Sequence, residues 1–289
     1  MNQSITGNTR LIGLIGSPVT HSLSPLMHNT AFKKLELDYA YLAFDVDTEN
    51  LEDGVKAMKT LNASGFNVTM PIKESILPYL DELSREAKLI GAVNTVKNIN
   101  GRLKGYNTDG MGYVKSLNEE GFEVGKKKFV LVGAGGAARS VAIQLAIESV
   151  REIVIFNRDR DKADEICQII RENFHDVEVK TSELNDEFLR RELINADVFV
   201  NCTPLGMGPH EEKSVIEDPE FLREDLVVSD LVYHPIKTRL IKIAETKGCE
   251  IVTGIGMILW QGAYAFKIWT GEEMPMEAVR KAIVTGRQR

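Results

Sequence analysis

Residues 129–139 read FVLVGAGGAAR, a short apolar run followed at once by small residues. The apolar run is typical of a buried strand, and the residues after the turn are typical of a helix. Gly133 allows a tight turn, Gly135 lets backbone N–H groups approach a pyrophosphate, and Ala138 permits close helix–strand packing. A bound anion would lie at the positive end of the helix. The stretch therefore predicts a dinucleotide-binding turn, with an ordinary tight turn as the alternative.

The chain after this turn continues to alternate short apolar runs with amphipathic segments. Helices are expected at 137–149, 161–173 and 238–247. Six strands with crossover helices predict a Rossmann-type, doubly wound parallel sheet, which we place at residues 109–255. The six strands are expected at 129–132, 153–156, 177–179, 198–200, 227–229 and 251–252.

The residues before 109 predict a separate α/β domain. Asn100-Gly101 tolerates the positive φ angles of a type I′ turn and predicts a hairpin. The segments 256–270 and 276–283 have helical periodicity and no further strand to cross to, so we expect residues 256–289 to pack back on this first domain, 1–108. Its strands are expected at 11–15, 40–44, 66–68 and 92–96, and its helices at 25–34, 51–61 and 84–90.

The composition limits the class of protein. The 289 residues are enough for about two domains at roughly 150 residues each, and 43% of them are apolar, which excludes intrinsic disorder. With 42 acidic and 35 basic residues the net charge is −7, which argues against nucleic-acid binding. The three cysteines have no paired spacing, so neither disulfides nor a metal site is expected. Without a membrane or signal segment, we expect a cytoplasmic protein.

The loop after the second strand of the Rossmann block should lie at the adenosine ribose. An acidic residue there binds the 2′-hydroxyl of NAD, whereas arginine suits the 2′-phosphate of NADP. Arg158 and Arg160 could bind that phosphate, but Asp159 and Asp161 would repel it, so we expect NAD to be favoured over NADP. Asn157 and Lys162 complete the candidate contacts. The alternative is a solvated charged loop.

Two serines precede the first helix of the first block. Ser24 is placed as its N-cap, with Pro25 at the first helical position, so capping alone explains this residue. Ser22 is harder to explain by capping. Two hydroxyls beside a helix N-terminus favour a carboxylate-binding site.

Further polar residues follow the strands of the first block. Asn67 and Thr69 point to one face of their strand, and Lys73 follows a proline expected to start a helix. Taken singly, Lys73 is more often a surface lysine. Asn94 and Asp109 add an amide and a carboxylate at strand ends, although Asp109 is equally well explained as a helix N-cap.

Three later segments add candidate contacts. Gln261 interrupts an apolar helix and needs a hydrogen-bonding partner, which a hydroxylated ligand would supply. Thr203 follows the fourth Rossmann strand, where the nicotinamide half of a cofactor should pass. Gly254 and Met257 are the remaining candidate cofactor contacts, although the apolar residues here are equally typical of a core.

These motifs together resemble the shikimate dehydrogenase family, including its quinate/shikimate branch. The resemblance covers nearly the full length and keeps both order and spacing. The matching segments are SPVTHSLSP (17–25), NVTMPIK (67–73), AVNT (92–95), NTDG (107–110), GAGGAAR (133–139), NCTPLGM (201–207), VYHP (232–235) and GMILWQGAYAF (256–266).

The resemblance implies a substrate domain joined to a Rossmann domain with the active site in the cleft between. It also implies NAD(P)-dependent, reversible oxidation of shikimate to 3-dehydroshikimate, as in aromatic amino acid biosynthesis. Lys73 and Asp109 match the acid–base pair, and how they divide that role is open. Substrate contacts match Ser22, Ser24, Asn67, Thr69, Asn94, Tyr233 and Gln261, and the pyrophosphate turn matches Gly133, Gly135, Gly136, Ala137 and Arg139.

One position departs from the family. NADP-using members commonly have a hydroxyl residue where Asp159 stands, which puts NADP preference in doubt without excluding it. The nearest alternative function is a quinate-preferring dehydrogenase. A non-catalytic nucleotide-binding regulator is the alternative from another class, and a small-molecule substrate is the expected partner, with a homodimer left open.

Overall fold

The structure, a computed structural model, describes residues 5–286 of the chain. It divides these residues into two compact units. Unit 1 contains the described residues up to Thr108 and from Gln261 onward, and unit 2 contains Asp109–Trp260. Residues 256–260, which we expected in the first domain, group with unit 2.

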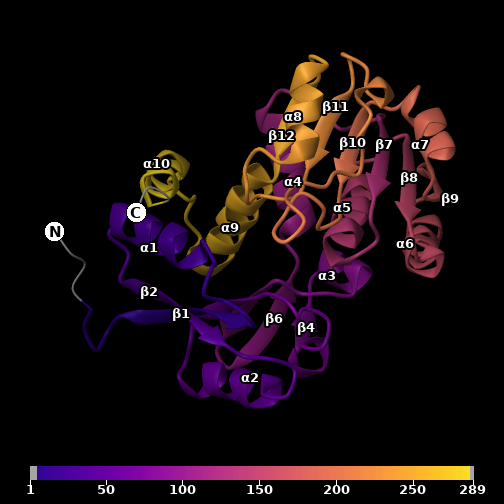
Figure 1. Cartoon of the computed structure of the whole chain (residues 1–289). Helices are drawn as coiled ribbons and strands as arrows, with labels where there is room; N and C mark the ends of the chain where they lie inside the picture. The colour runs from indigo at the N-terminus through magenta and orange to yellow at the C-terminus, as the bar shows by residue number, and fades with distance from the viewer. Residues whose placement is uncertain (1–4, 287–289) are drawn as a thin grey trace. The chain divides into compact units, whose positions relative to one another are not determined.

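Unit 2 is built on a six-stranded sheet in which every neighbouring pair is parallel (Figure 1). The strand order is β12-β11-β10-β7-β8-β9, so the first strand along the chain lies in the middle and the chain winds outward in both directions. This order confirms the doubly wound prediction. The strands are β7 (Lys128–Val132), β8 (Glu152–Asn157), β9 (Glu178–Glu183), β10 (Val198–Asn201), β11 (Val227–Asp230) and β12 (Glu250–Thr253).

Helices connect these strands, and one of them was not predicted. That helix is α7 (Asp186–Leu193), whose sequence DEFLRREL is mostly charged. The side chain of Asn185 caps it by accepting a hydrogen bond from the N–H of Phe188, and Leu189 and Leu193 bury its apolar stripe. The other helices of unit 2 are α4 (Asp109–Glu119), α5 (Gly136–Ile147), α6 (Arg160–Asn173), α8 (Arg239–Thr246) and the short 3-10 turn η2 (Pro219–Phe221).

Unit 1 contains a six-stranded mixed sheet of order β2-β1-β3-β5-β6-β4. β1 pairs in parallel with β2 and β3, whereas β5 pairs antiparallel with both β3 and β6. The two-residue strand β4 was not predicted, because it is too short to show a period. The strands are β1 (Arg10–Gly16), β2 (Tyr39–Asp45), β3 (Gly65–Val68), β4 (Glu82–Leu83), β5 (Thr95–Ile99) and β6 (Arg102–Tyr106).

The hairpin predicted at Asn100-Gly101 is present between β5 and β6. Both residues have positive φ angles, 54° and 87°, as a type I′ turn requires. The strand expected at 92–96 instead begins at Thr95 and runs to the turn. The expectation failed because Asn94 uses its side chain, together with its backbone, to hold the chain after β6.

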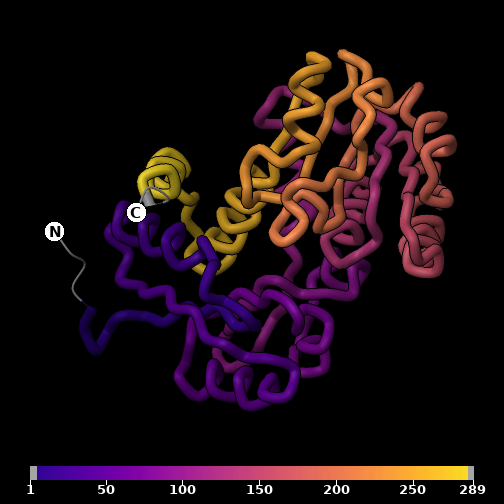
Figure 2. Tube along the Cα trace, viewed as in Figure 1, coloured from indigo at the N-terminus to yellow at the C-terminus, as the bar shows by residue number. Residues whose placement is uncertain are grey.

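The helices of unit 1 come from two separate parts of the described chain, the part before Asp109 and the part after Trp260. Figure 2 shows the yellow C-terminal helix α10 beside the indigo helix α1, and the two pack together. The part of α9 from Gln261 onward places Phe266 and Trp269 against α1 and the sheet, where Phe266 stacks on Phe32. The helices are α1 (Ser24–Lys34), α2 (Leu51–Thr60), η1 (Leu77–Tyr79), α3 (Arg85–Ile90), α9 (Gly254–Thr270), which continues from unit 2, and α10 (Met276–Gly286).

Candidate functional site

The glycine turn after β7 has the geometry that its sequence predicts. Gly133 has a φ of 116°, and a Cβ atom there would lie 2.9 Å from the carbonyl oxygen of Cys202. Only glycine fits such a position without strain. Gly135 is the N-cap of α5, and Ala138 is fully buried one turn further on. The turn therefore places the N-terminus of α5 directly after the carboxyl end of β7.

The space in front of this turn suits a pyrophosphate. A Cβ added at Gly135 or Gly136 would meet no atom of the protein within 4 Å, so the backbone at both residues borders open space. Ala137 is also exposed. Arg139 points elsewhere, because its guanidinium forms a 2.7 Å ion pair with Glu165 of α6. These residues fit the phosphate end of a nicotinamide dinucleotide.

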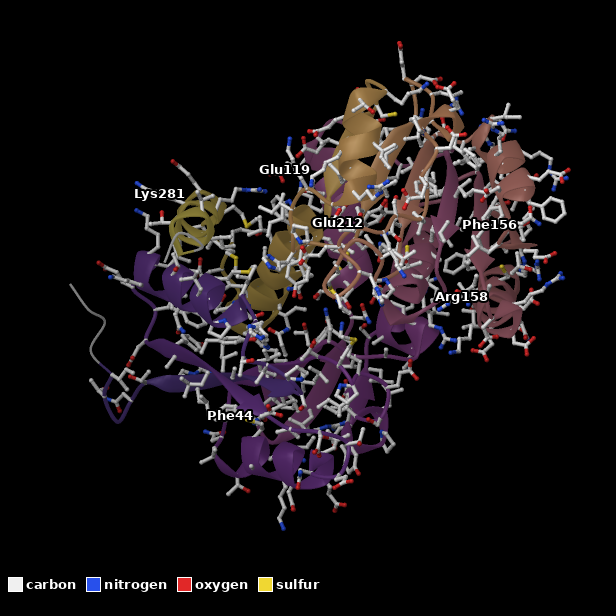
Figure 3. The ribbon with its side chains drawn as sticks, viewed as in Figure 1. Phe44, Glu119, Phe156, Arg158, Glu212 and Lys281 are labelled. Carbon is white, nitrogen blue, oxygen red and sulfur yellow. The ribbon has the colours of Figure 1, made fainter. Side chains whose placement is uncertain are left out.

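The loop after β8 contains the candidate ribose contacts. Asn157 donates a 2.6 Å hydrogen bond to the backbone oxygen of Asp159, and the Asp159 carboxylate lies 3.7 Å from Nζ of Lys162. Arg158 is exposed, and within residues 5–286 its guanidinium has no ion-pair partner. Figure 3 labels Arg158 just past the end of β8, two residues after Phe156.

A buried carboxylate orders the loops that follow β10 and β11. Asp230 accepts hydrogen bonds from Nδ2 of Asn201 (2.9 Å), the N–H of Val232 (2.9 Å) and the hydroxyl of Thr238 (2.6 Å). Burial raises the pKa of Asp230 to about 6 in spite of these donors. The half-buried side chain of Tyr233 follows directly after Val232.

The remaining candidate cofactor contacts also have local structural roles. The hydroxyl of Thr203 donates a 2.7 Å hydrogen bond to Oδ1 of Asn201. Gly254 lies so close to the loop after β11 that a Cβ would be 2.4 Å from the carbonyl oxygen of Leu231. Met257 is buried at the start of α9, as a core residue would be.

In unit 1 a buried tyrosine links two candidate substrate residues. The hydroxyl of Tyr41, on β2, donates a 2.7 Å hydrogen bond to Oδ1 of Asn67 on β3. The side chain of Ser24 at the start of α1 also hydrogen-bonds the Tyr41 hydroxyl. Burial of this hydroxyl raises the pKa of Tyr41. The ring of His28 stacks on the Tyr41 ring, with centroids 4.6 Å apart.

The amide of Asn67 continues this connection toward β5. Its Nδ2 donates to the backbone oxygen of Asn94 at 2.9 Å and to the hydroxyl of Thr95 at 3.1 Å. Thr95 in turn donates to Oδ1 of Asn94 at 3.0 Å. All of these side chains are buried, so their hydrogen bonds are shielded from water.

Asn94 connects the same set of side chains to α9. Its Oδ1 accepts from the N–H of Thr108 at 2.9 Å, and its Nδ2 donates to the hydroxyl of Thr108 at 2.9 Å. That hydroxyl donates to the backbone oxygen of Gln261 at 3.0 Å, and Oε1 of Gln261 lies 3.5 Å from Nδ2 of Asn94. The polar partner that Gln261 needs is therefore already supplied within the protein.

Three local predictions around the site are wrong. Ser24 is the first residue of α1 and Leu23 occupies the N-cap position, while the hydroxyl of Ser22 accepts a 3.2 Å hydrogen bond from the N–H of Ser24. Asp109 is likewise the first residue of α4 rather than the residue before it. No helix starts at Pro71, since residues 70–76 form turns.

The candidate acid–base residues lie in different units. Lys73 is half-buried in the turns after β3 of unit 1, four residues beyond the half-buried Thr69. Asp109 is buried at the start of unit 2. Both residues take part in further interactions within the protein.

Residues 5–286 form neither a metal-binding cluster nor a membrane-spanning helix. No group of three or more histidine, cysteine, aspartate or glutamate side chains in this range is placed to hold a metal ion. No helix in the same range is long and apolar enough to cross a membrane.

Three family models match the chain. The shikimate dehydrogenase substrate binding domain matches residues 14–96, shikimate / quinate 5-dehydrogenase matches 116–217, and the shikimate 5′-dehydrogenase C-terminal domain matches 254–284. A curated shikimate dehydrogenase (NADP(+)) of Alkaliphilus metalliredigens is 55% identical over 285 residues, which are 99% of this chain and 100% of the relative. The chain belongs to the shikimate dehydrogenase family. The resemblance identified from the motifs is thereby confirmed.

Solved structures of the shikimate dehydrogenase family share the fold of this chain. Shikimate 5-dehydrogenase from Listeria monocytogenes, in complex with shikimate and NAD, is 46% identical with a TM-score of 0.94 and covers 98% of this chain and 99% of its own. Quinate dehydrogenase from Corynebacterium glutamicum, in complex with NAD, is 31% identical with a TM-score of 0.89 and covers 96% and 99%. The predicted fold class is therefore confirmed.

The same comparisons give no support to a preference for NAD. The Alkaliphilus member of the shikimate dehydrogenase family is named for NADP(+), whereas the Listeria structure contains NAD. The preference inferred from Asp159 stays a prediction, and so do the roles of the individual site residues.

Two residues of this shikimate dehydrogenase family member were missed from sequence. Tyr41 lies on the buried face of β2, whose sequence is YAYLAFD. The signal in the sequence was a side chain with a polar group at a position that strand alternation places on that face. Asp230 ends an apolar strand, where a buried carboxylate is rare unless it is hydrogen-bonded. Neither signal says which groups would supply the hydrogen bonds.

Proposed function

We propose that this chain catalyses the reversible oxidation of shikimate to 3-dehydroshikimate with a nicotinamide dinucleotide. The observation that carries the proposal is the joining of Ser24, Asn67, Asn94 and Gln261 in unit 1 by one set of hydrogen bonds, buried at its centre and half-buried at Ser24 and Gln261. These residues match those that the family uses for the substrate carboxylate and ring hydroxyls. Amides and hydroxyls held in this way suit a small, polyhydroxylated acid.

Oxidation of a secondary alcohol removes a hydride from carbon and a proton from oxygen. When bound, the nicotinamide ring accepts the hydride. We assign the proton to Lys73, which takes it from the reacting hydroxyl during oxidation and returns it during reduction of the ketone. Asp109 acts as its partner by orienting the ammonium group. Tyr233 and Thr69 complete the substrate contacts, and Ser22 supports the carboxylate together with Ser24.

The residues that would hold the cofactor are those of the glycine turn and the loop after β8. The N–H groups at Gly135 and Gly136 would bind the pyrophosphate. Thr203, Gly254 and Met257 would lie toward the nicotinamide half. For the ribose, an exposed Arg158 favours a 2′-phosphate, whereas Asp159 opposes it and Lys162 reduces that opposition. We propose that the balance between Arg158 and Asp159 sets the coenzyme preference, with NAD favoured.

The test is a set of four specificity constants, for shikimate and quinate with NAD and NADP. We expect kcat/KM for shikimate to exceed that for quinate with either coenzyme. A higher value for quinate would reassign the substrate. Calorimetric binding of coenzyme without any shikimate-dependent absorbance change at about 340 nm, the signature of reduced nicotinamide, would instead favour a nucleotide-binding regulator.

The coenzyme assignment is tested with two matched variants. Arg158→Ala should lower the ratio of NADP to NAD specificity about tenfold or more, because a charge-assisted phosphate contact is lost. Asp159→Ser should raise the same ratio. Asp176→Ser, which replaces an exposed carboxylate beyond the far end of α6, is the control and should leave the ratio unchanged. A wild-type ratio above one would contradict the preference for NAD.

A further inference from the structure

The polar side chains that join α1 to α9 in unit 1 form one continuous series of hydrogen bonds, in which each residue donates to the next. Starting at α1, Ser24 donates to Tyr41 and Tyr41 donates to Asn67. The series then passes from Asn67 to Thr95 and from Thr95 to Asn94. It ends as Asn94 donates to Thr108 and Thr108 donates to the backbone oxygen of Gln261 on α9.

Two backbone groups fix this direction. The carbonyl oxygen of Asn94 can only accept, so the amide of Asn67 must turn Nδ2 toward it and Oδ1 toward Tyr41. The N–H of Thr108 can only donate, so the amide of Asn94 must turn Oδ1 toward it. Turning either amide over would bring like groups together in a buried place.

Three hydroxyl groups in this series, those of Tyr41, Thr95 and Thr108, have no assigned role in the reaction. Tyr41, Thr95 and Thr108 are each buried, and each hydroxyl both accepts and donates within the series. Such a hydroxyl holds its neighbours on both sides in one orientation, because it has a single hydrogen to donate. Hydrogen bonds in series also strengthen one another in a buried setting.

We infer that Tyr41 and Thr95 are positioning residues that orient the amide of Asn67 for substrate. The inference rests on the proposed function, which assigns Asn67 to the substrate. It also limits the kind of ligand group that Asn67 can bind. Both hydrogens of Nδ2 are donated within the protein, and Tyr41 occupies one of the two lone pairs of Oδ1. Asn67 thus offers a ligand only an acceptor, and the group it binds must be a donor such as a ring hydroxyl.

The experiment compares variants that remove one hydroxyl at a time. Tyr41→Phe removes the donor to Asn67 and keeps the ring that stacks on His28. Thr95→Val removes the hydroxyl between Asn67 and Asn94 at nearly constant volume, and Thr95→Ser restores it. Tyr39→Phe is the matched control, because Tyr39 lies on the same strand and face as Tyr41. Its hydroxyl accepts a 2.6 Å hydrogen bond from Arg10, which is not part of this series of hydrogen bonds.

We expect Tyr41→Phe and Thr95→Val each to raise the KM for shikimate about three- to tenfold, the range for losing one neutral hydrogen bond. The KM for coenzyme and kcat should stay within about twofold, because the candidate coenzyme contacts all belong to unit 2 and this amide belongs to unit 1. Thr95→Ser and Tyr39→Phe should match the wild type. A merely structural role would move both Michaelis constants together and would lower the melting temperature without this split.

Two results would overturn the inference, and they are distinguishable from failure of the proposed function. If the wild type oxidises shikimate and both hydroxyl-deleted variants keep its shikimate KM, the positioning role is wrong. An equal rise in the KM for shikimate and the KM for coenzyme would also show that the positioning role is wrong. If the wild type neither binds shikimate in calorimetry nor oxidises it, the proposed function fails and the positioning role fails with it.

Discussion

The hydroxyl of Thr238, the N-cap of α8, donates a 2.6 Å hydrogen bond to Oδ2 of Asp230 at the end of β11. The same hydroxyl accepts from the N–H of Ile241, so the start of α8 is tied to the carboxylate. With Asn201 and Val232 on the other carboxylate oxygen, one buried charge holds two loops in place. Such a charge is stabilised by its donors but still opposed by its burial.

Asp230→Asn is expected to remove a pH dependence of stability. Burial raises the pKa of Asp230 from 3.8 to about 6, so the folded protein binds this proton more tightly than the unfolded chain does. The free energy of unfolding of the wild type, relative to the variant, should therefore fall by about 2 kcal/mol as the pH rises from 4 to 6.5. Denaturant titrations at several pH values measure this. A constant difference would contradict it, and Asp225→Asn, an exposed carboxylate, is the control.

His28 should make the protein sensitive to acid. Both of its ring nitrogens are buried without hydrogen-bond partners in residues 5–286, and burial lowers its pKa from 6.5 to about 3. The unfolded chain binds this proton first, so stability present above pH 6.5 is lost as the pH falls toward 3. Relative to His28→Phe, the wild type should lose about 4 kcal/mol over that range.

The acid sensitivity is measured by denaturant unfolding of both proteins between pH 7 and pH 3. His175→Phe replaces an exposed histidine and should follow the wild-type curve. Parallel curves for the wild type and His28→Phe would show that the buried ring does not resist protonation.

Lys128→Met is expected to destabilise the protein without changing its kinetics. Nζ of Lys128 is buried and lies 2.7 Å from Glu192 and 3.4 Å from Glu152. Nζ of Lys180 also lies 2.8 Å from Glu152 and 3.1 Å from Glu192, so it compensates part of their charge when Lys128 is removed. We therefore expect a loss of about 1–3 kcal/mol, the cost of leaving a buried group with one partner fewer. Lys128 starts β7 and the glycine turn follows the other end of that strand, so kcat and both Michaelis constants should stay within about twofold.

The control for that variant is its neighbour. Lys127 is 41% exposed and lies 3.6 Å from Asp197, so Lys127→Met should cost no more than about 1 kcal/mol. Equal losses in the two variants would show that the buried network contributes nothing beyond a surface pair.

Lys73→Ala is expected to lower kcat for shikimate by about 10² or more, the usual contribution of a positioned acid–base group. The KM for coenzyme should be unchanged. Lys56→Ala, which removes an exposed lysine of α2, should leave kcat as it is. Near-normal turnover by the Lys73 variant in stopped-flow or steady-state assays would remove this lysine from the mechanism.

Much of this molecule was predictable because its signals are local. The run FVLVGAGGAAR places a strand, a turn and a helix within eleven residues, and Gly133 at a φ of 116° is a requirement of the chain itself. Asn100-Gly101 fixes a hairpin in the same way. Periodicity and turn chemistry act between residues close in sequence, so they can be recognised without knowing the fold.

Boundaries and caps were predicted less well, because contacts from distant segments set them. Asn94 delays the start of β5 by bonding to Thr108, and Ser24 enters α1 instead of capping it. In both cases a side chain uses its hydrogen bonds for a partner that the local sequence does not identify. The charged helix α7 was missed for another reason, because only Phe188, Leu189 and Leu193 mark its apolar face.

The sequence by itself determined the family and the α/β fold class, and it named the candidate residues for substrate and coenzyme. Only the tertiary structure decided which hydrogen bonds those residues make. Tyr41 and Asn67 are 26 positions apart, and Asn94 and Gln261 are 167 apart. A buried polar group must find a partner, but which one it finds depends on how the strands and helices bring distant segments together.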